Sequence, residues 1–364
     1  MSLQKKILIA PLSWGLGHVT RCLPIAKYFL SQKYEVSWAF SNIEEKKIIQ
    51  KYFPDAKMFQ TPSLNMKYAK NKFFFLSKIL LQSPKFLSFI RKERKWLQKI
   101  QKKQKFDIVI SDNRYGMRHS ECINIFISHQ IYPISNKGKC IDAIIAKMQK
   151  YILRKFDLIW KLDDEEQRIS GKLGWRKKDD YTAIGISSQF MLMNKMNLSK
   201  GKYSIKKQIL FLLSGPEPQR SILENIIREQ SIFLEAYNLI LVQGKIGTQN
   251  SLNNHAFSQI INLAQGKELL NLLEMSDLVV CRSGYSTLMD LVYLRKNMLL
   301  IPTPGQTEQE YLARYFHERK WALYAEQDEL NLAKQIERVF EMKTNFPKEK
   351  FQFKPLEDLI KVLI

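Results

Sequence analysis

Cysteine is scarce in this chain, and the four cysteines are too scattered to include a CxxC pair; they are Cys22, Cys122, Cys140 and Cys281. Their spacing argues against a disulfide framework and against a structural zinc site, and it suits a reducing compartment. The chain also lacks an uncharged apolar run approaching the roughly 20 residues of a membrane-spanning helix, and lacks a secretory leader pattern. We therefore expect a cytoplasmic protein whose cysteines are structural.

Acidic residues are few relative to basic ones. The sequence has 35 Asp and Glu against 58 Lys and Arg, a formal net charge of +23. A charge of this size indicates an anionic partner, and nucleic acid, an anionic membrane face and a phosphorylated small molecule all qualify.

About half of this excess lies in residues 67–105, which contain thirteen Lys or Arg and a single acid, Glu93. The stretch also holds seven aromatic residues: Tyr68, Phe73, Phe74, Phe75, Phe86, Phe89 and Trp96. Apolar residues recur at helical spacing between the cations of residues 85–105, which predicts an amphipathic cationic helix. Two interpretations stay open: a helix lying on an anionic membrane surface, on the inner face of the plasma membrane, or an ordinary surface helix whose apolar stripe faces the core.

A length of 364 residues with 45% hydrophobic content suits two α/β domains. Short apolar runs alternate with helical stretches, which predicts two doubly wound, Rossmann-like parallel sheets. The expected strands are "KILIAPL", "YEVSWAF", "FDIVISD", "NIFISHQ", "QILFLLS", "LILVQG", "DLVVCRSG" and "NMLLIPTP". We expect a first domain over 1–190, a linker over 191–207, a second domain over 208–343, and a tail over 344–364 whose final helix packs on the first domain.

The first predicted strand ends in a glycine turn, "PLSWGLGHVTR". In open parallel sheets, ligands bind where strands end and helices begin, because free N–H groups there attract anions. Gly15 and Gly17 let the backbone turn tightly, and the neutral imidazole of His18 could accept a proton. The turn lacks the third glycine of a dinucleotide fingerprint, and no acid follows the second strand, which argues against a nicotinamide enzyme.

Two later strands of the same predicted sheet end in polar residues. Asp112, Asn113 and Arg114 follow "FDIVI", and His129 and Gln130 follow "NIFIS". Asp112 could orient His18 or take a proton itself. The remaining paired acids, Asp163 with Asp164 and Asp179 with Asp180, are expected to be solvated loop residues rather than metal ligands.

The second half has the same layout, with three turns that follow strands of one sheet. Gly284 is expected to free the turn before a helix opened by Ser286 and Thr287, where N–H groups can hold a diphosphate. Asp290, one turn further on, could accept the hydroxyls of a ribose. The other two turns contribute Gln309 and Glu310, suited to sugar hydroxyls, and Ser214, Gly215 and Arg220, available to phosphate.

Together these motifs resemble the MurG-like glycosyltransferases, which include the enzyme that adds N-acetylglucosamine to the lipid precursor of peptidoglycan and the plant synthases of monogalactosyl lipids. The resemblance runs through "GLGH", "SGPEP", "DLVVCRSGYSTLMDL" and "PTPGQTEQEYLAR". It implies the two-domain GT-B fold, an acceptor site in the first domain, and a nucleotide sugar in the second. By this resemblance Arg282 and Ser283 join the donor-binding residues.

The chain departs from the family pattern in several places. Asp290 stands where the family usually has glutamate, and Gln309 is followed by Glu310 instead of a second glutamine. The features "SDNRYGMRH" and "FISHQ" are not typical of the peptidoglycan enzymes, so a different acceptor is expected. These features resemble a bacterial branch of glycosyltransferases related to that family.

The leading hypothesis is a metal-independent, inverting transfer from a nucleotide sugar, UDP-linked, to a hydroxyl of a glycan or lipid-linked acceptor. It requires no cofactor beyond the donor, and no nucleic-acid partner is expected. Three alternatives stay open: a nucleotide-sugar epimerase of the same fold, a non-catalytic nucleotide-sugar binder, and a nucleic-acid-binding protein.

Overall fold

The computed structural model describes residues 4–13, 15–63, 83–135, 137–176, 181–193, 206–245, 256–346, 354 and 356–361. The chain divides into two units, the first made of Met1–Lys67, Leu76–Leu192 and Lys350–Ile364, and the second mainly of Met193–Glu349. Most of the expected linker, 194–205, lies outside the described residues. None of the helices described is both long enough and apolar enough to cross a membrane.

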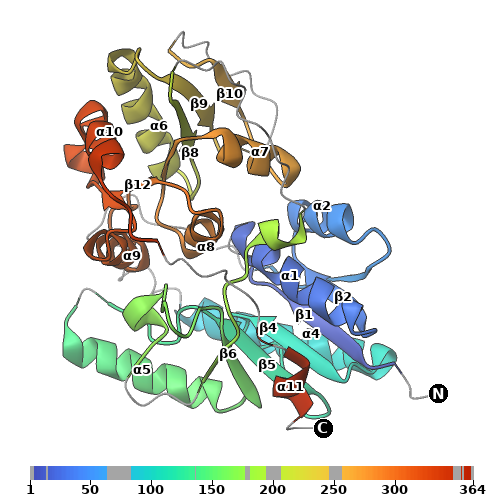
Figure 1. Ribbon diagram of the computed structural model, residues 1–364. Coiled ribbons are helices and arrows are strands. Elements are labelled where there is room, and N and C mark those ends of the chain that lie inside the picture. Colours follow the sequence, from blue (N-terminus) through green and yellow to red (C-terminus); the bar gives the residue numbers. More distant parts are fainter. Residues whose placement is uncertain are drawn as a thin grey trace. The chain divides into compact units, whose positions relative to one another are not determined.

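The first unit is built on a parallel sheet of seven strands in the order β3-β2-β1-β4-β5-β6-β7 (Figure 1). The strands are β1 (Lys6–Ala10), β2 (Glu35–Phe40), β3 (Lys57–Gln60), β4 (Ile108–Asp112), β5 (Ile123–Ser128), β6 (Leu158–Lys161) and β7 (Thr182–Ala183). The helices are α1 (Gly17–Ser31), α2 (Ile43–Tyr52), α4 (Ser83–Gln104), α5 (Lys139–Leu153) and α11 (Leu356–Lys361), with short 3-10 turns η2 (Gly171–Leu173) and η3 (Gln189–Leu192).

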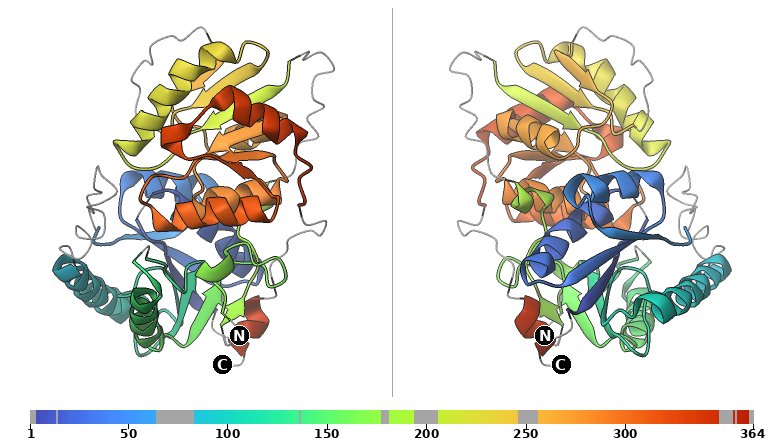
Figure 2. Two further views of the ribbon diagram at one scale, coloured as in Figure 1. Left: turned by 90° about the vertical axis from the view of Figure 1, so that its left-hand side faces the viewer. Right: turned by 90° about the vertical axis from the view of Figure 1, so that its right-hand side faces the viewer.

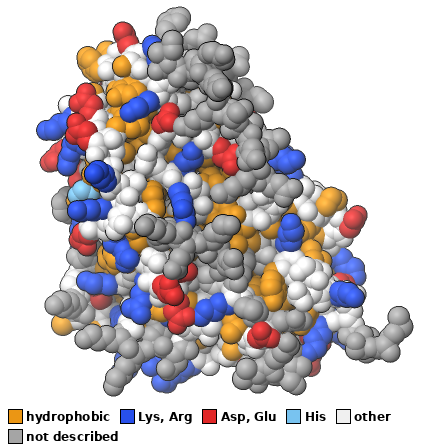
Figure 3. All heavy atoms as spheres, in the orientation of Figure 1, with side chains coloured by type: hydrophobic (Ala, Val, Ile, Leu, Met, Phe, Trp, Pro, Cys, Tyr) orange, Lys and Arg blue, Asp and Glu red, His pale blue; other side chains and the backbone are white. Residues whose placement is uncertain are grey.

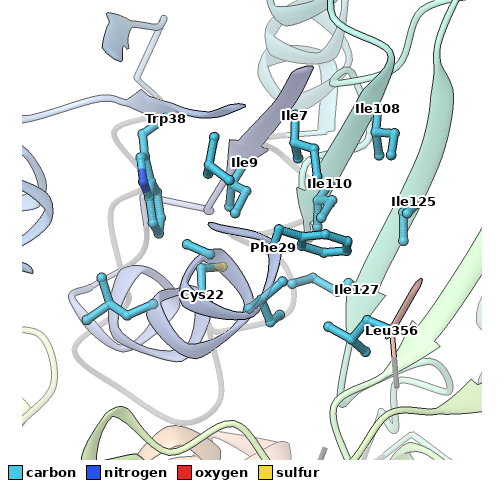
Figure 4. Packing of buried hydrophobic residues seen from close by; sticks show 14 of the residues in the cluster. Ile7, Ile9, Cys22, Phe29, Trp38, Ile108, Ile110, Ile125, Ile127 and Leu356 are labelled. Carbon is cyan, nitrogen blue, oxygen red and sulfur yellow. The ribbon is translucent and has the colours of Figure 1, made fainter. Parts of the chain in front are cut away.

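Helix α1 covers one face of this sheet because its apolar side matches the side chains of alternate strand residues. Figure 4 shows Phe29 and Cys22 of α1 pointing toward Ile9 and Ile110 of the sheet. Leu356 of the short C-terminal helix α11 is buried in the same cluster. Helix α11 therefore belongs to the core of the first unit.

Helices α4 and α5 cover the opposite face. Leu97 of α4 is buried against Leu8 and Val109. Tyr115 joins the two helices, because its ring lies edge-on to Phe86 of α4 and its hydroxyl donates to Gln149 of α5 over 3.0 Å. Figure 2 shows α4 (teal) and α5 (green) beside each other in both views.

The second unit holds a parallel sheet of six strands in the order β10-β9-β8-β11-β12-β13. These are β8 (Gln208–Leu212), β9 (Asn238–Val242), β10 (Gln259–Ile261), β11 (Leu278–Cys281), β12 (Met298–Leu300) and β13 (Leu323–Tyr324). The helices are α6 (Gln219–Gln230), α7 (Lys267–Met275), α8 (Tyr285–Tyr293), α9 (Thr307–Glu318) and α10 (Leu332–Glu341), with turns η4 (Ser231–Phe233) and η5 (Gln327–Glu329). Leu223 of α6 and Ile336 of α10 are buried on one face of this sheet.

The prediction of two doubly wound parallel sheets is confirmed, and each expected strand is present. The internal strand β6 and the edge strands β3, β7, β10 and β13 were not expected, because they are short and only partly buried. All four cysteines fall within the described residues. Cys22, Cys122 and Cys281 are buried, whereas Cys140 on α5 is exposed.

The cationic helix predicted over 85–105 is present as α4, and its apolar side faces the protein. Phe89 and Leu97 are buried, and the indole N–H of Trp96 donates to the carbonyl of Gln60 over 2.8 Å. The aromatic residues Tyr68, Phe73, Phe74 and Phe75 lie outside the described residues. The apolar residues of the described part of this stretch therefore behave as those of an ordinary surface helix. Most of the cations of α4 are exposed.

Candidate functional site

The strand order places the switch of the first sheet between β1 and β4, whose residues Ala10 and Ser111 are paired. Ligands bind beside such a switch in open parallel sheets. His18 follows β1, Asp112 ends β4, and His129 follows β5. These three polar residues therefore lie at the same carboxyl edge of the first sheet. The sequence predicted this grouping, and the structure brings these three residues together.

His18 and Asp112 are in direct contact. The Nδ1 atom of His18 lies 2.9 Å from Oδ2 of Asp112, whose side chain is fully buried. Burial alone would raise the pKa of Asp112. The charges of Arg21 and His18 nevertheless hold the pKa of this carboxyl well below its ordinary range. A carboxylate kept ionised this firmly is a poor base, so the geometry suits Asp112 to orienting the imidazole.

The pKa of His18 is lowered from its ordinary value by burial and by the charge of Arg21, against the opposing effect of Asp112. The imidazole is therefore neutral at physiological pH. When Nδ1 donates its proton to Asp112, Nε2 carries the lone pair that can accept a proton from a substrate.

Arg21 is a member of this cluster that sequence reasoning missed. It lies one helical turn after His18 on α1 and is 2% exposed. Its guanidinium donates to both carboxylate oxygens of Asp112, through Nε over 2.8 Å and through Nη2. It also lies 2.9 Å from Nδ1 of His18 and 3.1 Å from Nδ1 of His129. The i, i+3 spacing from His18 was the signal that could have identified it.

Arg114 is not available to an acceptor, and its assignment as a site residue is corrected. All five N–H groups of its buried guanidinium have acceptors within the first unit. These are Glu93, the carbonyls of Pro11 and Pro62, and the hydroxyls of Ser41 and Thr61. Arg114 therefore holds α4 and the neighbouring loops to the sheet.

The glycine turn after β1 is open to ligand approach. Gly15 has φ = +90°, which favours glycine, and a Cβ placed on it would meet nothing within 4 Å. Helix α1 then starts at Gly17 with no capping side chain and no acid in its first turn. Beside it, Asn113 has a left-handed φ of 55° and Gln130 is partly exposed. The edge thus presents a helix start with a partial positive charge.

The second sheet has its switch between β8 and β11, where Leu212 and Cys281 are paired. Ser214 and Gly215 follow β8 and are exposed, and Gly215 has φ = +100°. Helix α8 lacks both a capping side chain and an acid in its first turn, whereas at the start of α6 the Glu217 carboxylate accepts from the Ser221 N–H over 3.2 Å. By contrast, α2 is capped by Asn42 and begins with acids. The α8 start is therefore suited to an anion.

On α8, Ser286, Thr287 and Asp290 are partly exposed and share one side of the helix at i, i+1 and i+4. Gly284 precedes them with φ = −70°, which any residue can adopt, so the expectation that it frees the turn is wrong. A Cβ on Gly284 would meet nothing within 4 Å. A side chain at this position would therefore occupy open space above the helix start.

Arg220 is not available to phosphate, which corrects a second expected contact. Its five N–H groups all have partners: Glu217, Glu224, the carbonyl of Gln243 and the hydroxyl of Ser221. Although burial would raise it, hydrogen bonds from Arg220, Gln243, Lys245 and Arg228 lower the pKa of Glu224 to about 2. Arg220 is part of an ion-pair network that fixes α6 to β9.

Arg282 and Ser283 organise the loops around α8. Arg282 is 1% exposed and donates to the carbonyls of Ile301, Pro302 and Gln219 and to the amide of Gln327, while its Nε is buried without an acceptor. Burial lowers its pKa to about 10. The hydroxyl of Ser283 donates to the carbonyl of Gln309 over 2.8 Å. Both residues join the turns after β11 and β12.

Gln309 and Glu310 are engaged within their own turn. Gln309 accepts from the Thr303 N–H over 2.9 Å and donates to Gln306, and Glu310 accepts from the Gly305 N–H over 2.8 Å. Glu310 is 3% exposed. These contacts fix the shape of the "PTPGQ" turn.

Asp163 is not a solvated acid, contrary to expectation. It is fully buried and accepts from the backbone N–H groups of Asp164, Ile169 and Ser170, from the Ser170 hydroxyl, and from the indole of Trp175. Asp164 caps the following turn, and Asp179 and Asp180 lie outside the described residues. Across the described residues, no cluster of three or more His, Cys, Asp or Glu could hold a metal ion.

Residues 209–363 match the family model of the glycosyltransferase family 28 C-terminal domain. The chain is 27% identical over 147 residues to a UDP-N-acetylglucosamine--N-acetylmuramyl-(pentapeptide) pyrophosphoryl-undecaprenol N-acetylglucosamine transferase of Bacillus thuringiensis. It is 25% identical over 198 residues to a transferase of the same name from Bacillus cereus. The matches cover 40% and 52% of this chain and only 41% and 55% of those relatives.

Solved structures show the same fold at low identity. The glycotransferase of kitacinnamycin superposes with a TM-score of 0.68 at 13% identity, covering 93% of this chain and 90% of that one. MurG of Acinetobacter baumannii superposes with a TM-score of 0.56 at 12% identity and the same coverage. The spinosyn rhamnosyltransferase SpnG, complexed with thymidine diphosphate, has a TM-score of 0.62 at 11% identity, covering 93% and 92%. The resemblance is therefore confirmed: the chain has the fold of the MurG-like GT-B glycosyltransferases, and residues 209–363 match the model of the glycosyltransferase family 28 C-terminal domain.

Proposed function

We propose that this protein transfers a sugar from a nucleoside diphosphate sugar, UDP-linked, to a hydroxyl group of an acceptor. The observation that carries the proposal is the contact between His18 and Asp112 at the carboxyl edge of the first sheet. A neutral imidazole held by a buried carboxylate is the arrangement that general-base catalysis needs.

The second unit supplies the donor side of the proposal. Its uncapped α8 start, the space above Gly284 and the polar side of α8 suit a diphosphate followed by a ribose. The curated relatives are named for a UDP-linked donor, and SpnG was solved with a nucleoside diphosphate. These relatives supply the reason for choosing uridine.

In the proposed step, Nε2 of His18 takes the proton of the acceptor hydroxyl while the oxygen attacks the anomeric carbon. The new bond between carbon and oxygen forms as the bond to the diphosphate breaks, so a single displacement inverts the anomeric configuration. The leaving diphosphate gains stabilisation from the backbone N–H groups at the start of α8. Asp112 holds the Nδ1 proton and stabilises the imidazolium that forms.

We propose a lipid-linked acceptor at an anionic membrane surface. Helix α4 exposes the cations Lys85, Arg91, Lys92, Arg94, Lys95, Lys99, Lys102 and Lys103. Each basic residue near an anionic leaflet gains about 1 kcal/mol. Figure 3 shows Lys and Arg side chains spread over the drawn face, with Asp and Glu among them. The curated relatives are named for an undecaprenol-linked acceptor, which also supports this choice.

Helix α5, beside α4, contributes the apolar part of this surface. Ile141, Ile144, Met148 and Tyr151 are 41%, 60%, 62% and 64% exposed. They recur at i, i+3, i+7 and i+10, which places them on one side of the helix. Lys147, Lys150, Arg154 and Lys155 are also exposed on this segment. An apolar stripe flanked by cations is typical of helices that lie in a lipid interface.

The test of the proposed function is ligand-dependent unfolding followed by a turnover assay. UDP and UDP-sugars should raise the melting temperature, because a ligand at one hundred times its Kd stabilises the native state by about 2.7 kcal/mol. Stabilisation by adenine or guanine nucleotides alone would overturn the donor assignment. An isomerised sugar without transfer would identify an epimerase.

Matched variants assign the roles within this assay. Asp290→Ala should abolish stabilisation by UDP, whereas Glu268→Ala, an exposed acid in the first turn of α7, should not change it. His18→Ala should keep the stabilisation and lower kcat by roughly 10²- to 10⁴-fold. His119→Ala is the control for the loss of a histidine in the same unit. An unchanged kcat for the His18 variant would exclude its role as base.

A further inference from the structure

Nδ1 of His18 has two neighbours with opposite hydrogen-bonding properties. Oδ2 of Asp112 can only accept, and Nη2 of Arg21 can only donate; each lies 2.9 Å from Nδ1. The geometry therefore admits two neutral tautomers. In one, Nδ1 donates to Asp112 and Nε2 can act as a base; in the other, Nδ1 accepts from Arg21 and Nε2 carries the proton.

The carboxylate of Asp112 is shared. Arg21 donates to both of its oxygens, and His18 contacts only Oδ2, the oxygen that also receives Nε of Arg21. The backbone of Arg21 is also held in place, because the Ser187 hydroxyl donates to the carbonyl of Arg21. A permanent cation thus offsets the charge that would otherwise make His18 strongly basic.

We propose that Arg21 is a positioning residue that holds His18 neutral and sets the pH at which this histidine can accept a proton. The inference rests on the proposed function for its catalytic meaning, while the protonation of His18 can be measured without any substrate. With the charge of Asp112 offset, His18 stays unprotonated in slightly acidic solution and is ready to take the proton of a hydroxyl.

The charged and titratable groups that face His18 come from three elements. Arg21 belongs to α1, Asp112 ends β4, and His129 follows β5, while the thiol of Cys22 on α1 lies 3.8 Å from Oδ2 of Asp112. Arg21 and His129 lower the pKa of His18, and Asp112 raises it. Nδ1 of His129 can accept from Nη1 of Arg21, so the arginine ties both histidines to one carboxylate.

The experiment is a pH titration of the ligand-free protein in which ¹³C NMR monitors the protonation of each histidine. The chain has five histidines, so the His18 signal is identified by its loss in His18→Gln. Arg21→Gln removes the charge and keeps an amide donor; the His18 midpoint should rise by roughly one pH unit. Arg21→Lys retains the charge, so its midpoint should stay near that of the native protein.

Asp112→Asn tests the same inference in the opposite direction. It leaves the cation beside His18 without the carboxylate, so the midpoint should fall below the native value. A midpoint that is unchanged in Arg21→Gln, or that does not fall in Asp112→Asn, overturns the proposal. If Arg21→Gln does not fold, Arg21→Met, which removes the charge and keeps a long side chain, takes its place, with the same expected rise of the His18 midpoint.

The activity arm separates this inference from the proposed function. In Arg21→Gln the acid limb of kcat/KM should move to higher pH by the same interval as the NMR midpoint, with KM for the donor unchanged. A uniform loss at every pH, with the native limb retained, would show a merely structural role. Failure of the transferase assay in the native protein would overturn the proposed function and leave the NMR result intact.

Discussion

Arg114 and Glu93 form an ion pair with both side chains fully buried, and Nε of Arg114 lies 2.6 Å from Oε1 of Glu93. Glu93 is the lone acid of residues 67–105. Burial raises its pKa although Arg114 lies beside it, and its Oε2 also accepts from the Gly116 N–H over 3.1 Å. The pair fastens α4 to the turn after β4. A Cβ on Gly116 would lie 2.5 Å from the Ile90 carbonyl oxygen, so the contact is close.

Removing the arginine should be costly. Arg114→Leu leaves Glu93 buried without its cation, and such losses cost about 3–5 kcal/mol. The folded-state pKa of Glu93 should rise further, so the variant is least destabilised where Glu93 is protonated. Its deficit in unfolding free energy should therefore grow as pH increases from about 5 to about 8. Denaturant unfolding at several pH values measures it.

Two controls accompany this measurement. Arg91→Leu removes an exposed cation from the same helix and should change stability by less than about 0.5 kcal/mol. Adding Glu93→Gln to Arg114→Leu should remove the pH dependence. A deficit that is the same at every pH would show that Glu93 is not the group responsible.

Gly284 and Gly215 should respond differently to substitution by alanine. Gly284→Ala should leave the melting temperature unchanged, because the φ of −70° at this position suits any residue. The same change should weaken nucleotide affinity roughly tenfold or more, because the added methyl group occupies the space through which the ligand approaches. Gly215→Ala should cost roughly 1–2 kcal/mol, because its φ is +100°. Thermal unfolding and calorimetry of UDP binding measure both effects.

The comparison has its own control in the first unit. Gly138 also has a positive φ, of 101°, and open space around it, so Gly138→Ala should lose stability without any change in UDP affinity. Unchanged affinity in Gly284→Ala would place the nucleotide elsewhere on the second unit.

Membrane binding should require both the charge of α4 and the apolar stripe of α5. Sedimentation with anionic vesicles should decrease as salt is raised, and fall sharply when Lys92, Arg94, Lys95 and Lys99 are changed to Glu. Ile144→Ser and Met148→Ser keep the charge, yet each should weaken binding roughly tenfold. Binding to neutral vesicles that equals binding to anionic ones would contradict this surface.

Matched changes on the second unit distinguish a local surface from net charge. Four exposed cations there, Lys267, Arg314, Lys334 and Lys343, changed to Glu should preserve most of the binding. Phe233→Ser removes a side chain that is 72% exposed on η4 and should have no effect. Equal losses from both units would mean that only the total charge matters.

The strands and the glycine turns could be predicted because both are local features. A buried parallel strand shows as a continuous apolar run, and the polar residues after it must reach the carboxyl edge of the sheet. That reasoning brought His18, Asp112 and His129 together correctly. It applied equally to Arg114 and Arg220, and there it was misleading.

The partners of Arg114 could not be assigned from sequence because tertiary packing sets them. Arg114 pairs with Glu93, which lies 21 residues earlier on α4, the helix that precedes β4. No sequence pattern links the two residues. Arg220 had a local signal in Glu217 and Glu224, at i−3 and i+4, that indicates ion pairs as readily as a phosphate site. Helix α5 was missed because nothing in its sequence tells which apolar residues the sheet covers.

The distribution of cysteines gives this chain a built-in reporter position. Burial raises the pKa of Cys122 and Cys281 to about 12, and that of Cys22 well above its ordinary value. Only thiolates react with alkylating dyes at useful rates, so in the native state those three are protected. Cys140 is exposed at the beginning of α5, next to Ile141. A polarity-sensitive fluorophore attached there, without any engineered residue, would report directly whether this helix enters a lipid interface.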